Sequence, residues 1–214
     1  MNQAIAFFDG QNLFKAAKES FGTKHPDYNP KELARYVCSK KGYTLKQIRF
    51  YTGIPEPKDN FYLNAFWRNK LNQMKRDGIY TFHRMVRYSE VEITLTTGET
   101  HVIMKGREKG IDVRIALDMV RLATEREYDI AFIFSQDQDF YEAVKDIKII
   151  AEQQKREIKL ISVFPNSPLS KNDRGIYLTD WIKITQDEYQ KCIDVREYRT
   201  KAGRKISRDM VYQI

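Results

Sequence analysis

The spacing of hydrophobic positions along this chain alternates between a strand-like and a helix-like period. Residues 3–8 form a short apolar run that ends at Asp9-Gly10, and residues 11–20 then carry apolar side chains at helical spacing. Further strands are predicted over residues 45–52, 79–86, 129–135 and 157–164. Further helices are predicted over residues 29–42, 61–78, 111–126 and 139–154. This alternation predicts an α/β fold with three α/β/α layers, in which helices cover both faces of a mostly parallel sheet.

Two parts of the chain depart from this alternation. Residues 86–105, approximately, read as two β-rich arms around a turn signal at Thr97-Gly98, which predicts a projecting hairpin inserted between two α/β units. Residues 190–214 carry seven Lys/Arg against three Asp/Glu. We therefore expect one domain over residues 1–185, hairpin included, followed by a basic extension over residues 186–214.

Composition narrows the class of protein. With 214 residues and 42% hydrophobic content, the chain can bury a full core. We expect a cytoplasmic protein with no membrane partner, because the sequence shows neither a leader nor an apolar stretch near the roughly 20 residues of a membrane helix. Cys38 and Cys192 lie far apart, which favours buried thiols over a zinc site or a disulfide. The net charge of +8 fits a polyanionic partner, and homo-oligomer formation is left open.

Acidic and polar residues follow two of the predicted strands. Asp9 closes the first strand, and Asn12 follows one helical turn later. Ser135 ends the strand over residues 129–135, and Asp137 and Asp139 come directly after it. In parallel sheets the ligand site lies outside the carboxyl ends of the strands, so these side chains are predicted to share one edge.

A further acid, Asp112, lies in the first turn of a predicted helix and is expected at the same edge. Several carboxylates at one point repel each other unless a cation joins them, and oxygen ligands favour Mg²⁺ or Mn²⁺. Asp118 lies roughly 120° from Asp112 around that helix and is kept as a supporting residue. Any single Asp here can be read as a helix cap, so the joint pattern carries the prediction.

Three motifs together resemble the NYN-domain family, the LabA-like branch of the PIN-like nuclease superfamily: FFDGQNLF, KGIDVRIALDMV and FIFSQDQDF. The resemblance spans roughly residues 3–182. It implies a PIN-like fold and a metal-dependent ribonuclease active in RNA processing or decay, and we expect an endoribonuclease. The acidic positions of the family are matched here by Asp9, Asp112, Asp137 and Asp139, with polar helpers at Asn12 and Ser135. One departure is Gln136, where the family usually has glycine, and it affects the geometry of the site more than metal binding.

The corresponding hypothesis is that one or two Mg²⁺ or Mn²⁺ ions, held by these four acids, activate water for in-line attack on an RNA phosphodiester. Basic residues near aromatic ones are the candidate RNA contacts. The segment from Trp67 to Arg87 also contains Tyr80 and Phe82, with Tyr88 nearby, which suits phosphate binding combined with stacking of bases on the aromatic rings. The alternative reading of this segment is a solvated helix face with core aromatics. The predicted phosphate contacts are Arg68, Lys75, Arg76, Arg84, Arg87, Lys105, Arg107 and Lys109. The basic tail either binds RNA or stays solvated. Its basic residues include Arg196, Arg199, Lys201, Arg204 and Lys205.

The sequence argues against some other functions and leaves others open. A phosphatase of the haloacid dehalogenase type needs a second acid two residues after the first, where this chain has Gln11. A non-catalytic RNA-binding or scaffold module stays open because of Gln136, and a structure-specific DNA nuclease stays open because related folds cut both polymers. His25, His83 and His101 lack metal-ligand spacing, which argues against a histidine-based nuclease.

Overall fold

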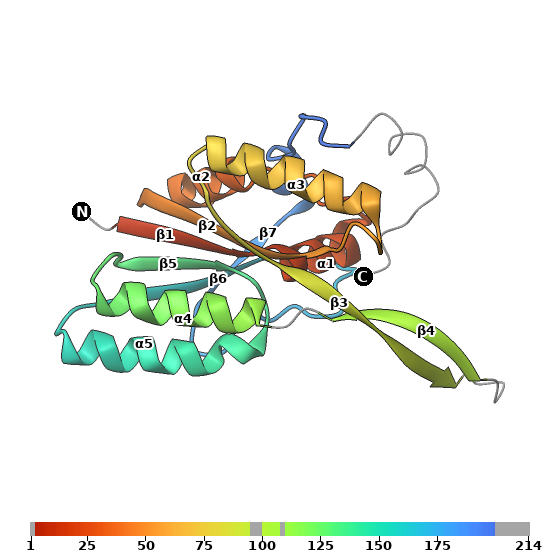
Figure 1. Cartoon of the computed structure of the whole chain (residues 1–214). Coiled ribbons are helices and arrows are strands. Elements are labelled where there is room, and N and C mark those ends of the chain that lie inside the picture. The colour runs from red at the N-terminus through yellow and green to blue at the C-terminus, as the bar shows by residue number, and fades with distance from the viewer. Residues whose placement is uncertain (1–2, 95–99, 108–109, 200–214) are drawn as a thin grey trace.

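The computed structural model describes residues 3–94, 100–107 and 110–199. Within these residues the chain folds around one sheet of seven strands (Figure 1). From edge to edge the strands are β4 (Thr100–Arg107), β3 (Tyr80–Thr94), β2 (Thr44–Pro55), β1 (Gln3–Asp9), β5 (Ile130–Phe134), β6 (Lys159–Pro165) and β7 (Asp180–Ile184). All neighbouring pairs are parallel except β3 and β4, which are antiparallel.

Helices cover both faces of this sheet (Figure 1). One face is covered by α1 (Gly10–Phe21), α2 (Pro30–Lys41) and α3 (Phe61–Arg76), and the other by α4 (Ile111–Thr124) and α5 (Tyr141–Gln153). Residues of β1 alternate between the two hydrophobic cores, as the period of a strand requires. Two short elements complete the described chain, the 3₁₀ turn η1 (Gln138–Phe140) and the helix α6 (Gln186–Gln190). The predicted three-layer fold is confirmed.

The ends of the helices follow their local sequence. Asn29 caps α2 by accepting from the backbone amides of its first turn, Pro30 occupies the first helical position, and Gly42 ends the helix in the left-handed region. At the start of α1, a Cβ on Gly10 would lie 2.6 Å from the Phe50 ring. Glycine therefore allows α1 to begin directly against β2, immediately after Asp9.

The predicted hairpin is present and continues the sheet. β3 is one continuous strand, whose first half, Tyr80 to Val86, pairs with β2 and whose second half, Arg87 to Thr94, pairs with β4. The paired second half extends away from the body of the domain (Figure 1). The predicted turn at Thr97-Gly98 lies outside the described residues.

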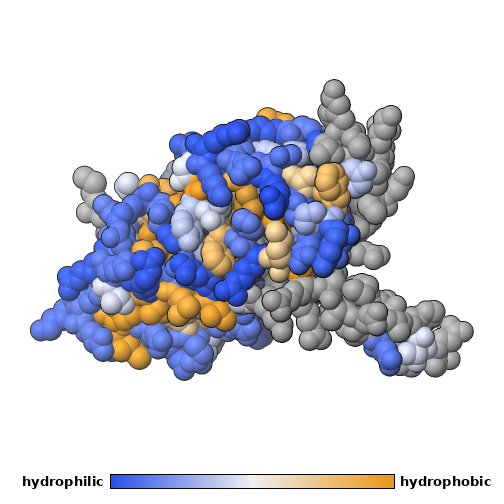
Figure 2. Space-filling view, in the orientation of Figure 1, coloured by the Kyte–Doolittle hydropathy of each residue, from blue (hydrophilic) through white to orange (hydrophobic). Residues whose placement is uncertain are grey.

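One face of α3 is buried in the core and includes Leu63, Phe66, Trp67 and Leu71, whereas Phe61 at the first position of the helix is exposed. Elsewhere, hydrophobic side chains gather on the face shown in Figure 2 over the layer of α4 and α5. Val113, Leu117 and Ile149 are among the exposed residues of these two helices. Homo-oligomer formation stays a prediction.

None of the helices in the described part of the chain has both the length and the apolar character needed to cross a membrane. The two cysteines, Cys38 and Cys192, are free and buried, as predicted. Burial raises the pKa of each thiol to about 11, so both are protonated at neutral pH.

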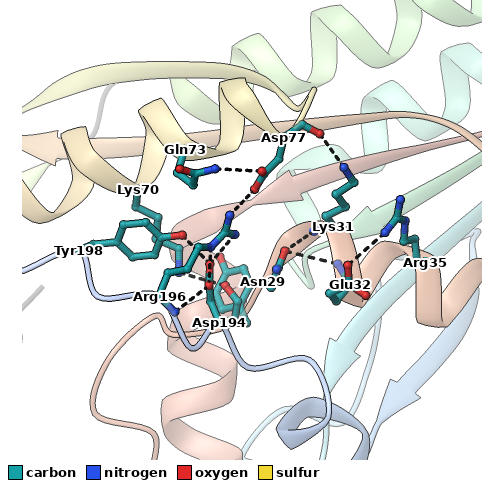
Figure 3. A network of polar contacts seen from close by, with 11 residues as sticks. Asn29, Lys31, Glu32, Arg35, Lys70, Gln73, Asp77, Asp194, Arg196 and Tyr198 are labelled. Atoms are coloured by element: carbon teal, nitrogen blue, oxygen red, sulfur yellow. Dashed lines mark hydrogen bonds and ion pairs between the residues drawn. The ribbon is translucent and has the colours of Figure 1, made fainter.

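Packed structure continues past residue 185, where the sequence pattern places the end of the domain. Tyr189, Cys192 and Tyr198 lie in the same core as α1, α2 and α3. Arg196 forms ion pairs with Asp77 at 2.7 Å and with Asp194 at 2.8 Å (Figure 3). The first part of the predicted basic extension is therefore packed on the domain, while Lys201, Arg204 and Lys205 lie outside the described residues.

A buried lysine joins α3 to the segment before α2 and contacts the C-terminal segment. Lys70 is only 1% exposed, and its ammonium group donates to the carbonyl of Tyr28 at 3.0 Å and to that of Pro26. The ammonium also lies 5.6 Å from the centre of the Tyr198 ring (Figure 3). Burial lowers the pKa of Lys70 to about 8, although the charge of Asp194 opposes this shift.

Replacing this side chain, Lys70→Ala, is expected to destabilise the protein by about 2–3 kcal/mol, since it leaves two carbonyls unsatisfied and a cavity among aromatic rings. Urea unfolding at pH 7 measures the loss, with Lys75→Ala, exposed on the same helix, as the control. Between about pH 8 and 10.5 the unfolded wild type binds more protons than the folded one, so its stability should rise with pH there. Equal stability of Lys70→Ala and Lys75→Ala would refute this role of Lys70.

Candidate functional site

The two acidic motifs meet at the carboxyl ends of β1 and β5. These strands are parallel neighbours, with Phe8 of β1 in register with Phe134 of β5. Asp9 ends β1, and Ser135 directly follows β5. The hydroxyl of Ser135 donates to Asp9 Oδ2 at 3.3 Å, which joins residues 126 positions apart in the sequence. The prediction that both strand ends share one edge is confirmed.

Hydrogen bonds extend this contact in both directions. Asp9 Oδ1 accepts from the backbone amide of Asn12 at 3.1 Å, so Asp9 also caps α1. The side-chain oxygen of Asn12 accepts from the backbone amide of Gln136 at 3.0 Å. Ser135 Oγ accepts from the amide of Asp137 at 3.1 Å, and Asp137 Oδ1 accepts from the amide of Asp139 at 3.1 Å. Five of the six predicted site residues therefore belong to one hydrogen-bonded chain, called here the acidic edge: Asp9, Asn12, Ser135, Asp137 and Asp139.

The carboxyl group of Asp9 is under electrostatic strain. Asp9 is 8% exposed, and burial raises its pKa to about 6. The amide of Asn12 lowers the pKa, the negative charge of Asp137 raises it, and the hydroxyl of Ser135 and the charge of Lys15 lower it. A buried carboxylate beside a second carboxylate is a place where a bound cation stabilises the ionised form.

The donor groups of the acidic edge fit a hard divalent cation. Its ligand atoms are carboxylate, amide and hydroxyl oxygens, which suit Mg²⁺ or Mn²⁺. In the described part of the chain, no group of three or more His, Cys, Asp or Glu side chains is arranged to hold a metal ion. Mg²⁺ commonly binds through one or two carboxylates and keeps several waters, so a site built on Asp9 and Asp137 is compatible with this finding. The ligand set of four acids stays a prediction.

Asp112 lies apart from this chain of contacts. It is the second residue of α4 and is partly buried, and α4 packs against β1, β2 and η1. Among the described residues, no hydrogen bond joins its carboxylate to Asp9 or Asp137. Its role as a metal ligand stays a prediction.

Asp118 holds α4 on the sheet, and its role as a supporting residue of the site stays a prediction. Its buried carboxylate accepts from Arg49 at 2.9 Å and from the Tyr51 hydroxyl at 2.7 Å, and it pairs with Arg114 at 3.0 Å. Since Arg49 and Tyr51 belong to β2, these contacts hold α4 on the sheet. They lower the pKa of Asp118 despite its burial.

Two glutamines of the FSQDQDF motif bind a loop that the sequence pattern does not connect with the site. Gln136 Nε2 donates to the carbonyls of Asn172 at 3.1 Å and Arg174 at 2.9 Å. Gln138 donates to the carbonyl of Gly175 at 3.1 Å and accepts from the amide of Tyr177 at 3.1 Å. In the sequence, the presence of Gln136 where the family usually has glycine marks this position as unusual. The sequence does not indicate the partners of Gln136 in the loop, which lie 36 residues or more away.

The predicted RNA contacts fall into three groups. The exposed ones are Arg68, Lys75, Arg76 and Arg84. Arg87, Lys105 and Arg107 lie on the strands of the hairpin, and Lys109 lies outside the described residues. Burial, followed by the nearby charges of Lys75 and Arg68, lowers the pKa of His83 on β3. The four exposed basic residues of the first group lie on α3 and β3 and are called here the basic surface between α3 and β3.

The aromatic side chains expected beside these basic residues are mostly engaged in packing. Trp67 is 3% exposed in the core, so the stacking expected of it is wrong. The Tyr80 ring is covered by the guanidinium of Arg49 at 3.7 Å from its centre, and Arg114 lies 5.5 Å from the Phe82 ring. The alternative reading, in which these aromatic residues belong to the core, is confirmed for Trp67, because α3 must bury one face against the sheet.

Comparison with known proteins places this geometry in context. The family model described as NYN domain matches residues 4–173. No curated protein matches the chain. A protein of unknown function from Vibrio parahaemolyticus is 14% identical, with a TM-score of 0.48 over 87% of this chain and 94% of that one. A deacetylase from the teicoplanin biosynthesis pathway, in complex with teicoplanin, is 9% identical, with a TM-score of 0.30 over 72% and 67%. Both scores are below 0.5 and carry no argument about function.

Proposed function

Because this chain belongs to the NYN domain family, a family of PIN-like nucleases, we propose that it is a metal-dependent endoribonuclease whose active site is the acidic edge. The observation that carries the proposal is the hydrogen bond between Ser135 and Asp9. It joins the first and last of the three sequence motifs at the carboxyl ends of two parallel strands, where ligands of α/β sheets bind.

The residues of the acidic edge have distinct tasks in this proposal. Asp9 and Asp137 hold the cation, and Asp112 and Asp139 complete its surroundings. Ser135 orients both Asp9 and Asp137, because its hydroxyl donates to the first and accepts from the amide of the second. Asn12 fixes the distance between α1 and the end of β5 through its contact with Gln136. When bound, Mg²⁺ or Mn²⁺ neutralises phosphate charge and lowers the pKa of a bound water.

RNA as the substrate is supported by charge. An acidic edge alone repels a polyanion, whereas the chain as a whole carries a net charge of +8. The exposed basic residues between α3 and β3, together with those of the hairpin, are proposed to bind phosphates away from the cleaved bond.

The alternatives lead to different outcomes. The haloacid dehalogenase mechanism lacks its general acid, since the residue two positions after Asp9 is the buried Gln11. A non-catalytic RNA-binding module would bind RNA without cutting it. A DNA nuclease would need metal in the same way but would prefer the other polymer.

We would incubate the purified wild type with end-labelled single-stranded RNA, single-stranded DNA and duplex RNA, each with Mn²⁺, Mg²⁺ or EDTA. We expect internal cuts in RNA that need metal and that fall by at least about 100-fold in Asp137→Asn. Asp146→Asn, exposed on α5, is the matched control and should cut like the wild type. Binding of RNA with every substrate left intact would replace the catalytic proposal with the binding module, and preferential cutting of DNA would correct the substrate.

A further inference from the structure

The segment between β6 and β7, residues 166–179, is fixed to three other parts of the chain. Near its start, Ser167 donates to the carbonyl of Ser20 in α1 at 2.7 Å, and the hydroxyl of Ser170 lies 2.7 Å from that of Ser20. Toward its end, the Tyr177 ring lies 5.6 Å from the Tyr141 ring at the start of α5. This segment, called here the β6–β7 loop, therefore passes from α1 to α5.

The middle of the β6–β7 loop is bound to the acidic edge itself. Gln136 is buried and uses both hydrogens of its side-chain amide on the carbonyls of Asn172 and Arg174. The backbone amide of the same residue donates to Asn12. One residue, placed between Ser135 and Asp137, thus joins the loop, α1 and the end of β5. Glycine at this position could not make the two contacts to the loop.

The middle of the loop also carries exposed positive charge. Lys171 and Arg174 are exposed, and in the described part of the chain neither side chain forms an ion pair. The acid between them, Asp173, is instead paired with Lys183 at 3.6 Å. The backbone of Arg174 is bonded directly to the site, because its carbonyl accepts from Gln136 at 2.9 Å.

We propose that Lys171 and Arg174 form a phosphate-binding rim beside the acidic edge, held in place by Gln136 and Gln138. The inference rests on the proposed function and deepens it, because it assigns the path of the RNA strand next to the cleaved bond. The phosphates that flank that bond must pass an acidic surface, and cations on a fixed loop offset the repulsion. The rim is distinct from the basic surface between α3 and β3.

The anchoring half of the proposal has a readout that needs no RNA. In Gln136→Ala, hydrogen–deuterium exchange of the amides over residues 171–177 should rise about 10-fold or more, because the loop loses its two bonds to the site. Gln154→Ala is the matched control, since Gln154 Nε2 also donates to two carbonyls, those of Ala123 and Thr124, on α4. Unchanged exchange in Gln136→Ala would overturn the anchoring role.

The binding half is tested with a labelled 12-nucleotide single-stranded RNA, whose affinity is measured across salt concentrations in the Asp137→Asn background. Arg174→Gln should weaken binding by about 3- to 10-fold and reduce the salt slope by about 0.7. In the otherwise wild-type protein, Arg174→Gln should raise KM and leave kcat almost unchanged, since a contact with a flanking phosphate stabilises the ground state and the transition state alike. Lys148→Gln, exposed on α5, is the charge-matched control.

The outcomes separate this inference from the proposed function. If the wild type cuts RNA but Arg174→Gln and Lys171→Gln keep its KM and salt slope, the rim is wrong and the nuclease stands. If Asp137→Asn binds RNA through the rim while the wild type cuts nothing, the rim stands in a binding module. If no form of the protein binds RNA, both proposals fall.

Discussion

Replacing Asp9 with asparagine is expected to reduce RNA cleavage by about 1000-fold or more and, at the same time, to make the metal-free protein more stable at neutral pH. The loss of cleavage follows because Asp9 is the buried carboxylate of the acidic edge and the proposed cation ligand. The substitution keeps the fold, since an asparagine oxygen can still cap α1 by accepting from the amide of Asn12.

The gain in stability follows from the pKa of Asp9, which burial and Asp137 raise from 3.8 to about 6. The folded state therefore binds the proton more tightly than the unfolded state does. Stability from this group is fully present below about pH 3.8 and is lost as the pH rises through about 6. At pH 7 the ionised Asp9 destabilises the fold by about 2–3 kcal/mol, which Asp9→Asn removes.

Urea unfolding in EDTA at several pH values between 4 and 8 measures this effect. The advantage of Asp9→Asn should grow between about pH 4 and 6 and then stay constant. Added Mn²⁺ should raise the Tm of the wild type more at pH 8 than at pH 5, and should barely change that of Asp9→Asn. Asp146→Asn controls for the removal of an exposed carboxylate. A variant less stable than the wild type at pH 8 in EDTA would contradict the account of the strained carboxylate.

The sequence predicted the acidic edge because its signal is local. Asp9 and Asp137 each follow an apolar run, and a parallel sheet brings the carboxyl ends of such runs to one edge whatever the details of packing. The bounds of α2 were predicted for the same reason, since Asn29 and Gly42 act on their own helix ends. Residues whose role depends on chain neighbours, or on the period of a strand, can be recognised from the sequence alone.

The roles that could not be predicted belong to residues with distant partners. Lys70 reads as one basic position among several on a helix, yet it bonds carbonyls more than 40 residues away. Trp67 and Arg68 are adjacent in the sequence, and only the packing of α3 decides that the first is buried and the second exposed. The contact of Gln136 with the β6–β7 loop depends likewise on a segment without helical or strand period, which periodicity does not place.

Replacing Asp118 with alanine should destabilise the protein by about 3–5 kcal/mol, the largest stability loss predicted here. The carboxylate is 1% exposed and receives Arg49 and the Tyr51 hydroxyl, so its removal leaves the buried guanidinium of Arg49 without a counter-charge on this side. The pKa of Asp118 is lower in the folded protein than in the unfolded chain. Its contribution to stability is therefore present above the pKa of the unfolded state and is lost as the pH falls. Urea unfolding at pH 7 measures the loss, with Asp146→Ala as the control.

A second variant separates stability from catalysis. Removing both charges, in Arg49→Met/Asp118→Leu, should restore much of the stability, because an apolar pair of similar volume avoids burying an unpaired charge. Asp118 holds α4 on β2 and bonds no residue of the acidic edge in the described part of the chain, so the double variant should keep metal-dependent cleavage within about threefold of the wild type. A well-folded double variant that has lost cleavage would instead return Asp118 to the site, as a residue that positions Asp112 six places before it on the same helix.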